Sequence, residues 1–220
     1  MKMILFTLTM PKDKIYEGLF PLNKPRGISS SQFLLDYVRS QNIPRDVKAG
    51  YAGTLDVLAE GLLVVAIGRK WTKGLSELSD SDKVYEAVLN LSGVTDSADL
   101  ECPVSVIPNL TEPTFERVLQ VLEKTMGEQT QMPPMYSAKS VDGERAYEAA
   151  REGRKLDLKP CKITVHQIEL LDYDFPKMEI RVRCSKGTFI RTLAEDIGKQ
   201  LTGGAYVERL VRTRVGDYEL

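Results

Sequence analysis

Hydrophobic residues recur along the chain with two different spacings, which predict helices and strands in mixed order. After Thr188, apolar residues stand at positions 190, 193, 194, 197 and 201, the spacing of one face of a helix that Thr188 would cap. Over 178–184, apolar and charged residues alternate, as in a strand with one buried and one solvated face. These two segments are the clearest helix and the clearest strand in the sequence.

Weaker patterns of the same kinds predict the other elements. Strands are expected at 18–24, 62–67, 84–91, 163–171 and 205–215, and helices at 116–126, at 143–151 and from Ser29, which fits a capping box with Gln32. A loop is expected at 42–49. The elements follow no regular strand-helix-strand rhythm, and no glycine-rich phosphate loop follows a strand. We therefore expect an α+β fold with a mainly antiparallel mixed sheet flanked by helices.

The composition is that of a folded protein, because 42% of the 220 residues are hydrophobic and 28% are charged. The formal net charge is −1, so any contact with nucleic acid has to come from local basic patches. The longest apolar run, 62–67, is too short to cross a bilayer, and residues 1–14 lack the apolar core and cleavage site of a signal peptide. We expect a single domain over 1–220, in the cytoplasm and away from membranes.

Few residues are available for metal or redox chemistry. Cys102, Cys161 and Cys184 are widely spaced and form no CxxC motif, so we expect reduced thiols rather than a zinc or redox site. The one histidine, His166, lies in a strand-like stretch with no serine or cysteine motif beside it. Histidine-rich metal sites are excluded on this ground.

Asp56 is the first candidate for catalysis, because it ends a segment of small residues, 50–56, that leads toward an apolar strand. Glycines at 50 and 53 allow unusual backbone angles and the close approach of a ligand. A carboxylate fixed at the mouth of an apolar strand can act as a nucleophile or a base. From this local pattern alone, an aspartate that caps a turn is the simpler explanation.

Two other side chains suit an RNA pocket, although each has a simpler explanation when taken alone. Arg191 has the planar fork that pairs with a buried carboxylate, but at this position a surface or phosphate contact is the simpler role. Tyr85 can stack on an unpaired base, yet it also fits a core or an edge strand. Basic residues recur only in loose groups, at 24–26, 69–73, 151–155, 181–186 and 209–214.

Six segments in order resemble the TruB family, whose members make pseudouridine at position 55 of transfer RNA. They are GLFPLNKPRGISS (18–30), GYAGTLDVLAEG (50–61), DKVY (82–85), MPPMYSAK (132–139), CSKGTFIR (184–191) and GAYVERL (204–210). The resemblance covers residues 18–212 and implies the pseudouridine synthase fold. It outweighs the simpler explanations of the individual residues.

Carried over by position, the resemblance implies that Asp56 is the catalytic aspartate and Arg191 its ion-pair partner. Tyr85 would stack on the target base and is a candidate for removing the proton from C5. Contacts with the substrate RNA are expected at Tyr51, Phe189, Leu210, Lys24 and Lys186. The resemblance further implies no metal and no cofactor. We expect a monomer that binds the T-arm of tRNA and requires no protein partner.

The sequence departs from the family pattern at Tyr51, where histidine is usual, at Val57, where proline is usual, and at Phe189, where tyrosine is common. No C-terminal RNA-binding domain of the PUA type is evident before Leu220. These departures motivate an alternative, a non-catalytic tRNA-binding or RNA-folding protein on the same scaffold. A guide-RNA-dependent enzyme acting on ribosomal RNA is a third hypothesis. We expect an enzyme that flips the uridine out and uses Asp56 either to attack C1′ or to remove a proton from C2′.

Overall fold

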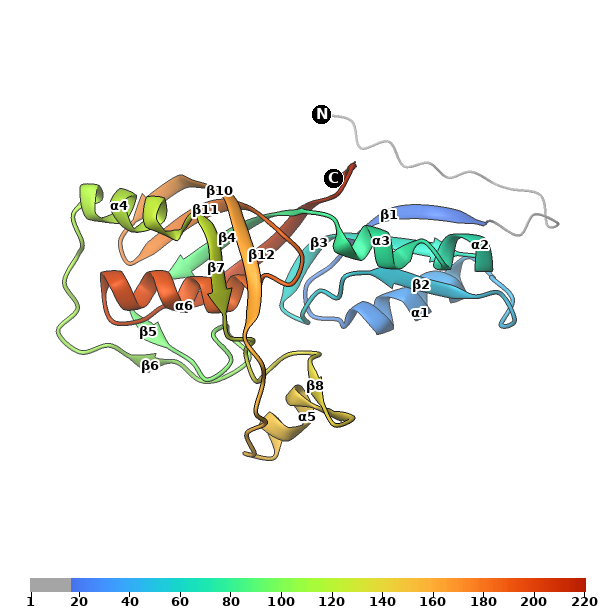
Figure 1. Ribbon diagram of the computed structural model, residues 1–220, viewed down its shortest axis with the longest axis horizontal. Helices are drawn as coiled ribbons and strands as arrows, with labels where there is room; N and C mark the ends of the chain where they lie inside the picture. The colour runs from blue at the N-terminus through green and yellow to red at the C-terminus, as the bar shows by residue number, and fades with distance from the viewer. Residues whose placement is uncertain (1–16) are drawn as a thin grey trace.

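A nine-stranded sheet forms the framework of the computed structural model, which describes residues 17–220 (Figure 1). Seven strands lie side by side in the order β1 (Gly18–Lys24), β3 (Ala59–Ile67), β12 (Tyr206–Val215), β4 (Lys83–Asn90), β11 (Lys177–Cys184), β10 (Cys161–Asp174) and β7 (Gly127–Gln131). The other two, β2 (Ala49–Ala52) and β13 (Tyr218–Glu219), pair with β3 and β12. Only β3 and β12 pair in parallel, which confirms the expected mainly antiparallel mixed sheet.

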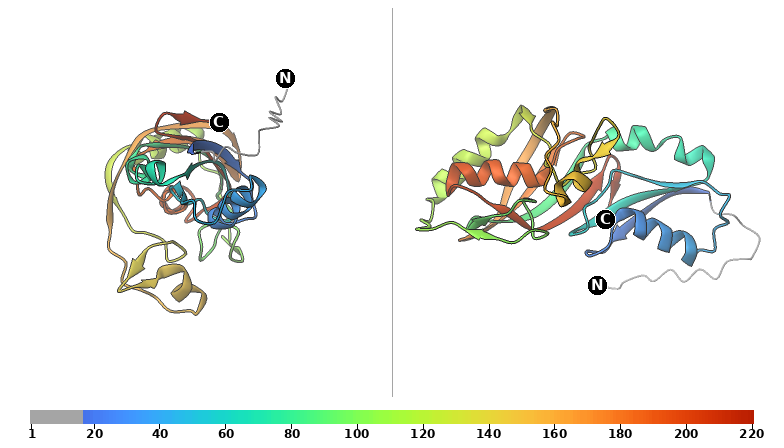
Figure 2. Two further views of the ribbon diagram at one scale, coloured as in Figure 1. Left: turned by 90° about the vertical axis from the view of Figure 1, so that its right-hand side faces the viewer. Right: turned by 90° about the horizontal axis from the view of Figure 1, so that it is seen from below.

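The described residues form six helices, most of which lie against the sheet near one of its two ends. They are α1 (Ser30–Ser40), α2 (Arg69–Thr72), α3 (Leu75–Asp80), α4 (Phe115–Thr125), α5 (Ala146–Arg151) and α6 (Ile190–Leu201). Helices α4 and α6 pack on each other and on β10 and β12, whereas α1, α2 and α3 contact β2 (Figures 1 and 2). The larger apolar core lies under α4 and α6 and includes the fully buried Leu89, Ile180 and Ile197.

Two short hairpins stand outside the main sheet. One pairs β5 (Gly93–Val94) with β6 (Ser105–Val106), and the other pairs β8 (Ser140–Val141) with β9 (Glu144–Arg145). The second hairpin and α5 extend away from the sheet (Figures 1 and 2). The helix expected at 143–151 therefore begins only at Ala146, because the residues before it turn back in the hairpin.

For two helices an N-cap residue was predicted, and only one of the two predictions is right. At α1 the Ser29 hydroxyl accepts a hydrogen bond from the Gln32 backbone N–H, as the capping pattern indicated. At α6 the N-cap is Phe189, and the Thr188 hydroxyl instead donates to the Ser185 carbonyl. The prediction of a Thr188 cap is wrong because that hydroxyl closes the turn before the helix.

The strand β2 was also missed, since residues 42–49 and 50–56 carry the small and polar residues of a loop. Pairing with the apolar strand β3 supplies the hydrogen bonds that the short segment cannot provide by itself. Among residues 17–220, no helix is long and apolar enough to cross a membrane, and no group of three His, Cys, Asp or Glu side chains is placed to hold a metal ion. The expectation about residues 1–14 lies outside the described residues.

Candidate active site

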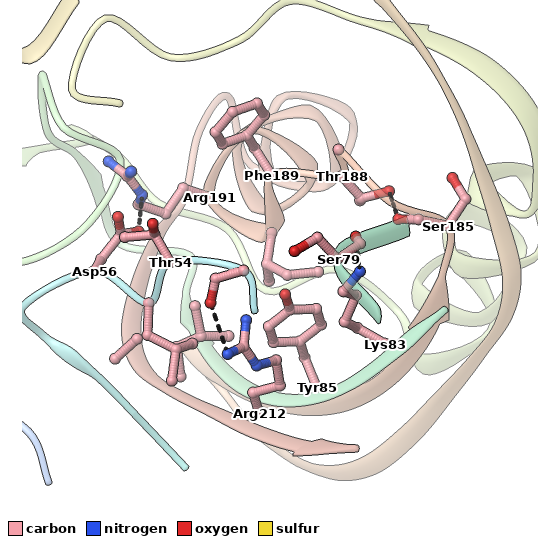
Figure 3. A pocket seen from close by; sticks show the side chains of 16 residues that line it. Thr54, Asp56, Ser79, Lys83, Tyr85, Ser185, Thr188, Phe189, Arg191 and Arg212 are labelled. Carbon is pink, nitrogen blue, oxygen red and sulfur yellow. Dashed lines mark hydrogen bonds and ion pairs between the residues drawn. The ribbon is translucent and has the colours of Figure 1, made fainter. Parts of the chain in front are cut away.

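A cavity of about 190 Å³ opens beside the central strands of the sheet, β12 and β4. Its wall comes from the β2–β3 connection, the α3–β4 corner, the β11–α6 loop and β12 (Figure 3). Sites for drug-sized ligands usually occupy ~300–1,000 Å³, so this volume suits a single flat ring rather than a larger molecule.

The loop that carries Asp56 is fixed from behind by the turn between β1 and α1. The Ser30 hydroxyl, in a residue only 1% exposed, accepts from the Leu55 N–H and donates to the Leu55 carbonyl, both at 2.9 Å. The Gly27 N–H donates to the Val57 carbonyl at 2.7 Å. Both residues next to Asp56 are thus bonded to the same turn, which leaves the carboxylate facing the cavity.

The Arg191 guanidinium meets Asp56 in the cavity wall, with Nε 2.9 Å from Oδ2 (Figure 3). Its side chain is only 4% exposed. Nη1 donates to the Ser97 carbonyl at 2.9 Å and Nη2 to the Tyr136 carbonyl at 2.6 Å, while Asp99 Oδ2 lies 3.7 Å from Nε. The ion pair implied by the resemblance is therefore present. The two-pronged fork expected from arginine is not, because both Nη groups are bonded to backbone carbonyls.

Two opposing effects set the pKa of Asp56. Desolvation by the surrounding protein raises the pKa of Asp56 above its usual range, although 41% of the side chain remains exposed. The Arg191 charge opposes this rise, and the charges of Asp99 and Glu101 add to it. The carboxylate is thus more basic than a free aspartate while a fixed cation still favours its ionised form.

Aromatic and aliphatic side chains complete the wall. Tyr85, Phe189 and Leu210 all line the cavity, as the resemblance implied. Burial raises the pKa of Tyr85 and Arg212 opposes that rise, so Tyr85 is a neutral phenol in the cavity wall. Phe189 is held by the buried Gln131 amide, which accepts from its N–H at 2.8 Å and donates to its carbonyl at 3.0 Å.

Three of the expected RNA contacts lie elsewhere. Lys24 is 0% exposed and its ammonium donates to the Pro25 and Ile28 carbonyls, so it holds the turn and cannot reach a phosphate. Tyr51 is outside the cavity wall, with its hydroxyl bonded to Ser31. Lys186 stands exposed beside the cavity residues Ser185 and Gly187, where it pairs with Asp80 at 2.8 Å. Lys24 is therefore excluded from a phosphate contact, whereas the RNA contacts expected of Tyr51 and Lys186 stay predictions.

Residues that the sequence did not single out also belong to this site. Asp99 contacts Arg191 from a loop after β5, and Lys83 and Arg212 line the cavity. The basic groups at 83 and 212 belong to segments that the resemblance covers, but neither local pattern nor spacing marks them as buried. Gly53, at φ +66°, leaves the space beside them open.

A sequence model described as "TruB family pseudouridylate synthase (N terminal domain)" matches residues 41–190. A relative named tRNA pseudouridine synthase B from Bacteroides fragilis is 43% identical over 90% of this chain and 86% of its own length. Another protein of that name from Protochlamydia amoebophila is 40% identical over 92% and 75%. The fold and the matched segment define a pseudouridylate synthase.

Solved structures agree with that class. The crystal structure of a Cbf5-Nop10-Gar1 complex contains a chain with 28% identity and a TM-score of 0.71, over 93% of this chain and 50% of that one. An H/ACA RNP bound to a substrate RNA contains one with 26% identity and a TM-score of 0.67, over 93% and 49%. This chain thus spans about half the length of those solved chains. Within its class, it belongs to the TruB family.

Proposed function

We propose that this chain converts a uridine of tRNA to pseudouridine, at position 55 in the T-arm. The observation that carries the proposal is the Asp56–Arg191 ion pair in the wall of a cavity sized for one base. The names of the relatives from Bacteroides fragilis and Protochlamydia amoebophila support tRNA as the substrate. We further propose that the protein acts as a monomer and needs no protein partner or cofactor, as the family resemblance implies.

The target base has to leave its stack before it can enter this cavity. Flipping a nucleotide out of an RNA loop costs a few kcal/mol, which stacking and phosphate contacts offset. In our proposal Tyr85 stacks on the flipped base, Phe189 and Leu210 close over its edges, and Lys186 contacts a phosphate at the rim. The apolar wall also keeps water away from the cleaved intermediate.

Asp56 then acts at the sugar. Its carboxylate either attacks C1′ or removes a proton from C2′, and both routes need it ionised and fixed in place. Arg191 is proposed to supply that fixation, since its Nε faces the carboxylate while its other nitrogens are anchored to backbone. After the base has turned and joined C1′ through C5, Tyr85 is our candidate for receiving the C5 proton.

Tritium release from tRNA labelled at C5 of uridine tests the proposal. Wild-type protein should release tritium, and Asp56→Asn should release none while its Kd for tRNA stays within about twofold, because the amide keeps the shape but cannot act as nucleophile or base. Turnover by Asp56→Asn would remove the role we assign. If wild type and variant both bind tRNA and neither releases tritium, the chain is the non-catalytic RNA-binding protein.

A further inference from the structure

Two buried basic side chains form the floor of the cavity. Lys83 on β4 is 6% exposed and Arg212 on β12 is 1% exposed. Arg212 is the direct cross-strand partner of Tyr85, and Lys83 stands two residues before Tyr85 on the same strand face. All three side chains lie together on the side of the cavity away from Asp56 and Arg191 (Figure 3).

Neither cation has a carboxylate partner. Among residues 17–220, none of the ion pairs includes Lys83 or Arg212. The Lys83 ammonium donates to the carbonyls of Ser79 and Ser81, and Arg212 donates to those of Leu62 and Gly53. Asp56, the carboxylate of the same cavity, is already paired with Arg191. Burying charges without a counterion is unfavourable, so a fold that keeps two of them in one cavity is suited to an anion.

Both cations still have hydrogens to offer. An ammonium has three N–H donors, of which Lys83 uses two on backbone carbonyls. Arg212 Nη1 donates to no backbone carbonyl and lies 3.2 Å from where a Cβ on Gly53 would stand, with Lys83 Cε 4.0 Å from the same point. The two cations therefore converge on a space that exists because residue 53 has no side chain.

We propose that Lys83 and Arg212 are catalytic residues that bind the uracil anion formed when the glycosidic bond breaks. This inference rests on the proposed function. When C1′–N1 breaks, both bonding electrons leave with N1, and the resulting negative charge spreads to O2 and O4 of the base. The base then turns, C5 bonds to C1′, the C5 proton leaves and N1 takes up a proton, so the composition is unchanged. Donors aimed at the negative charge that develops on the base as the C1′–N1 bond breaks lower the barrier to cleavage without being consumed.

This role explains why the anion stays in place while it turns. The base is not covalently bound at that stage, and stacking on Tyr85 alone resists sliding only weakly. Two N–H donors on one side attract the carbonyl oxygens in either orientation, because O2 and O4 share the charge. Desolvation and the neighbouring Arg212 charge lower the pKa of Lys83, which is the cost that a bound anion would relieve.

The test compares two leaving groups in Lys83→Met, a substitution that keeps length and removes the charge. Single-turnover cleavage is measured with tRNA carrying uridine or 5-fluorouridine at the target position, by loss of the nucleoside from digested RNA. Fluorine stabilises the base anion, so it makes cleavage less dependent on the cation. We expect Lys83→Met to cleave the tRNA that carries uridine about 100-fold more slowly than wild type does. With 5-fluorouridine the loss of rate should be smaller by a factor of at least about three, and the Kd for tRNA should stay within about twofold of the wild-type value.

The comparison remains informative if the variant folds less well, because the ratio of the two rates cancels the fraction of folded protein. Equal losses for the two substrates would overturn the proposal, since a structural defect slows both alike. Lys83→Arg, which keeps a cation, should recover part of the cleavage rate with uridine. If Lys83→Arg recovers none of it and Lys83→Met slows both substrates equally, the two results together overturn the proposal. Lys177→Met removes an exposed lysine from another face of the sheet and should match wild type. If wild type itself cleaves neither substrate, the proposed function fails instead.

Discussion

At the scale of single residues, the proposed chemistry depends on one guanidinium group with four acceptors around it. Two backbone carbonyls anchor the Nη groups of Arg191, and Nε faces the carboxylates of Asp56 and Asp99. Because its side chain is 4% exposed, water cannot replace those acceptors. Arg191 therefore holds a permanent positive charge at one fixed position opposite Asp56.

Arg191→Lys should lower kcat by at least about 100-fold. The substitution would let the Asp56 carboxylate shift, and a shift of about 1 Å in a reacting group can cost about that much. A single ammonium cannot serve Asp56 and the carbonyls of Ser97 and Tyr136 together. Tritium release under saturating tRNA measures kcat, and filter binding checks that Kd is unchanged. Near-normal turnover would show that the arginine geometry is dispensable.

The raised pKa of Asp56 predicts the pH dependence of the reaction. In the proposed reaction the carboxylate is the active form, so kcat/KM should fall as pH drops through a pKa above the ~3.9 of a free aspartate. Asp99→Asn should move this acid limb to lower pH, because the Asp99 charge contributes to the rise. Profiles of kcat/KM against pH for the wild type and for Asp99→Asn measure this shift. An acid limb that moves upward in Asp99→Asn would contradict the assignment.

At the scale of elements, the catalytic loop takes its shape from a neighbouring turn. The Ser30 hydroxyl is the main link, since it both donates to and accepts from Leu55 in a site closed to water. The loop residues 53–58 include no helix or strand that would hold Asp56 by themselves. The first turn of α1 thus positions a carboxylate that lies 26 residues further along the chain.

Ser30→Ala should reduce the free energy of unfolding by about 1–3 kcal/mol, because it leaves the buried Leu55 N–H unsatisfied. It should also lower kcat, since Asp56 loses its fixed backbone. Urea unfolding and tritium release measure the two effects. Ser40→Ala, at the exposed far end of the same helix, is the control and should leave both quantities unchanged. A stability loss without any change in kcat would separate the turn from catalysis.

At the scale of the whole molecule, most of the exposed basic groups on the described strands of the main sheet are already paired with carboxylates. Arg181 contacts Glu86 and Glu169, Arg183 contacts Asp82, and Arg209 contacts Glu60. With a net charge of −1, the chain therefore offers RNA few unneutralised cations on these strands. Of the two lysines in the expected set, Lys24 is buried and Lys186 is exposed at the rim of the cavity.

Lys186→Met should weaken tRNA binding and reduce the slope of log K against log salt by about one, the effect of losing one phosphate contact. Lys177→Met, which removes an equally exposed lysine elsewhere on the sheet, should leave the slope unchanged. Titrations at several salt concentrations with wild type and both variants measure it. The same slope in all three proteins would mean that Lys186 does not contact the RNA backbone.

The sequence by itself determined the elements whose side chains have a clear period or a specific motif. The alternating strand at 178–184, the amphipathic helix after residue 188 and the ordered family segments led to the fold class and to Asp56, Tyr85 and Arg191 as candidates. These features are local, because the spacing of apolar residues reports which face of one element is buried.

Only the tertiary structure decided which charged side chains are buried and what they contact. Lys24, Lys83 and Arg212 look like surface residues in the sequence, yet all three are enclosed by elements from other parts of the chain. Lys24 and Lys83 donate to carbonyls of nearby residues, whereas Arg212 donates to the carbonyl of Leu62 on another strand. The strand β2 and the anchors of Arg191 likewise depend on partners far along the chain. Burial and hydrogen bonding of this kind arise when separate elements pack together, so no local pattern encodes them.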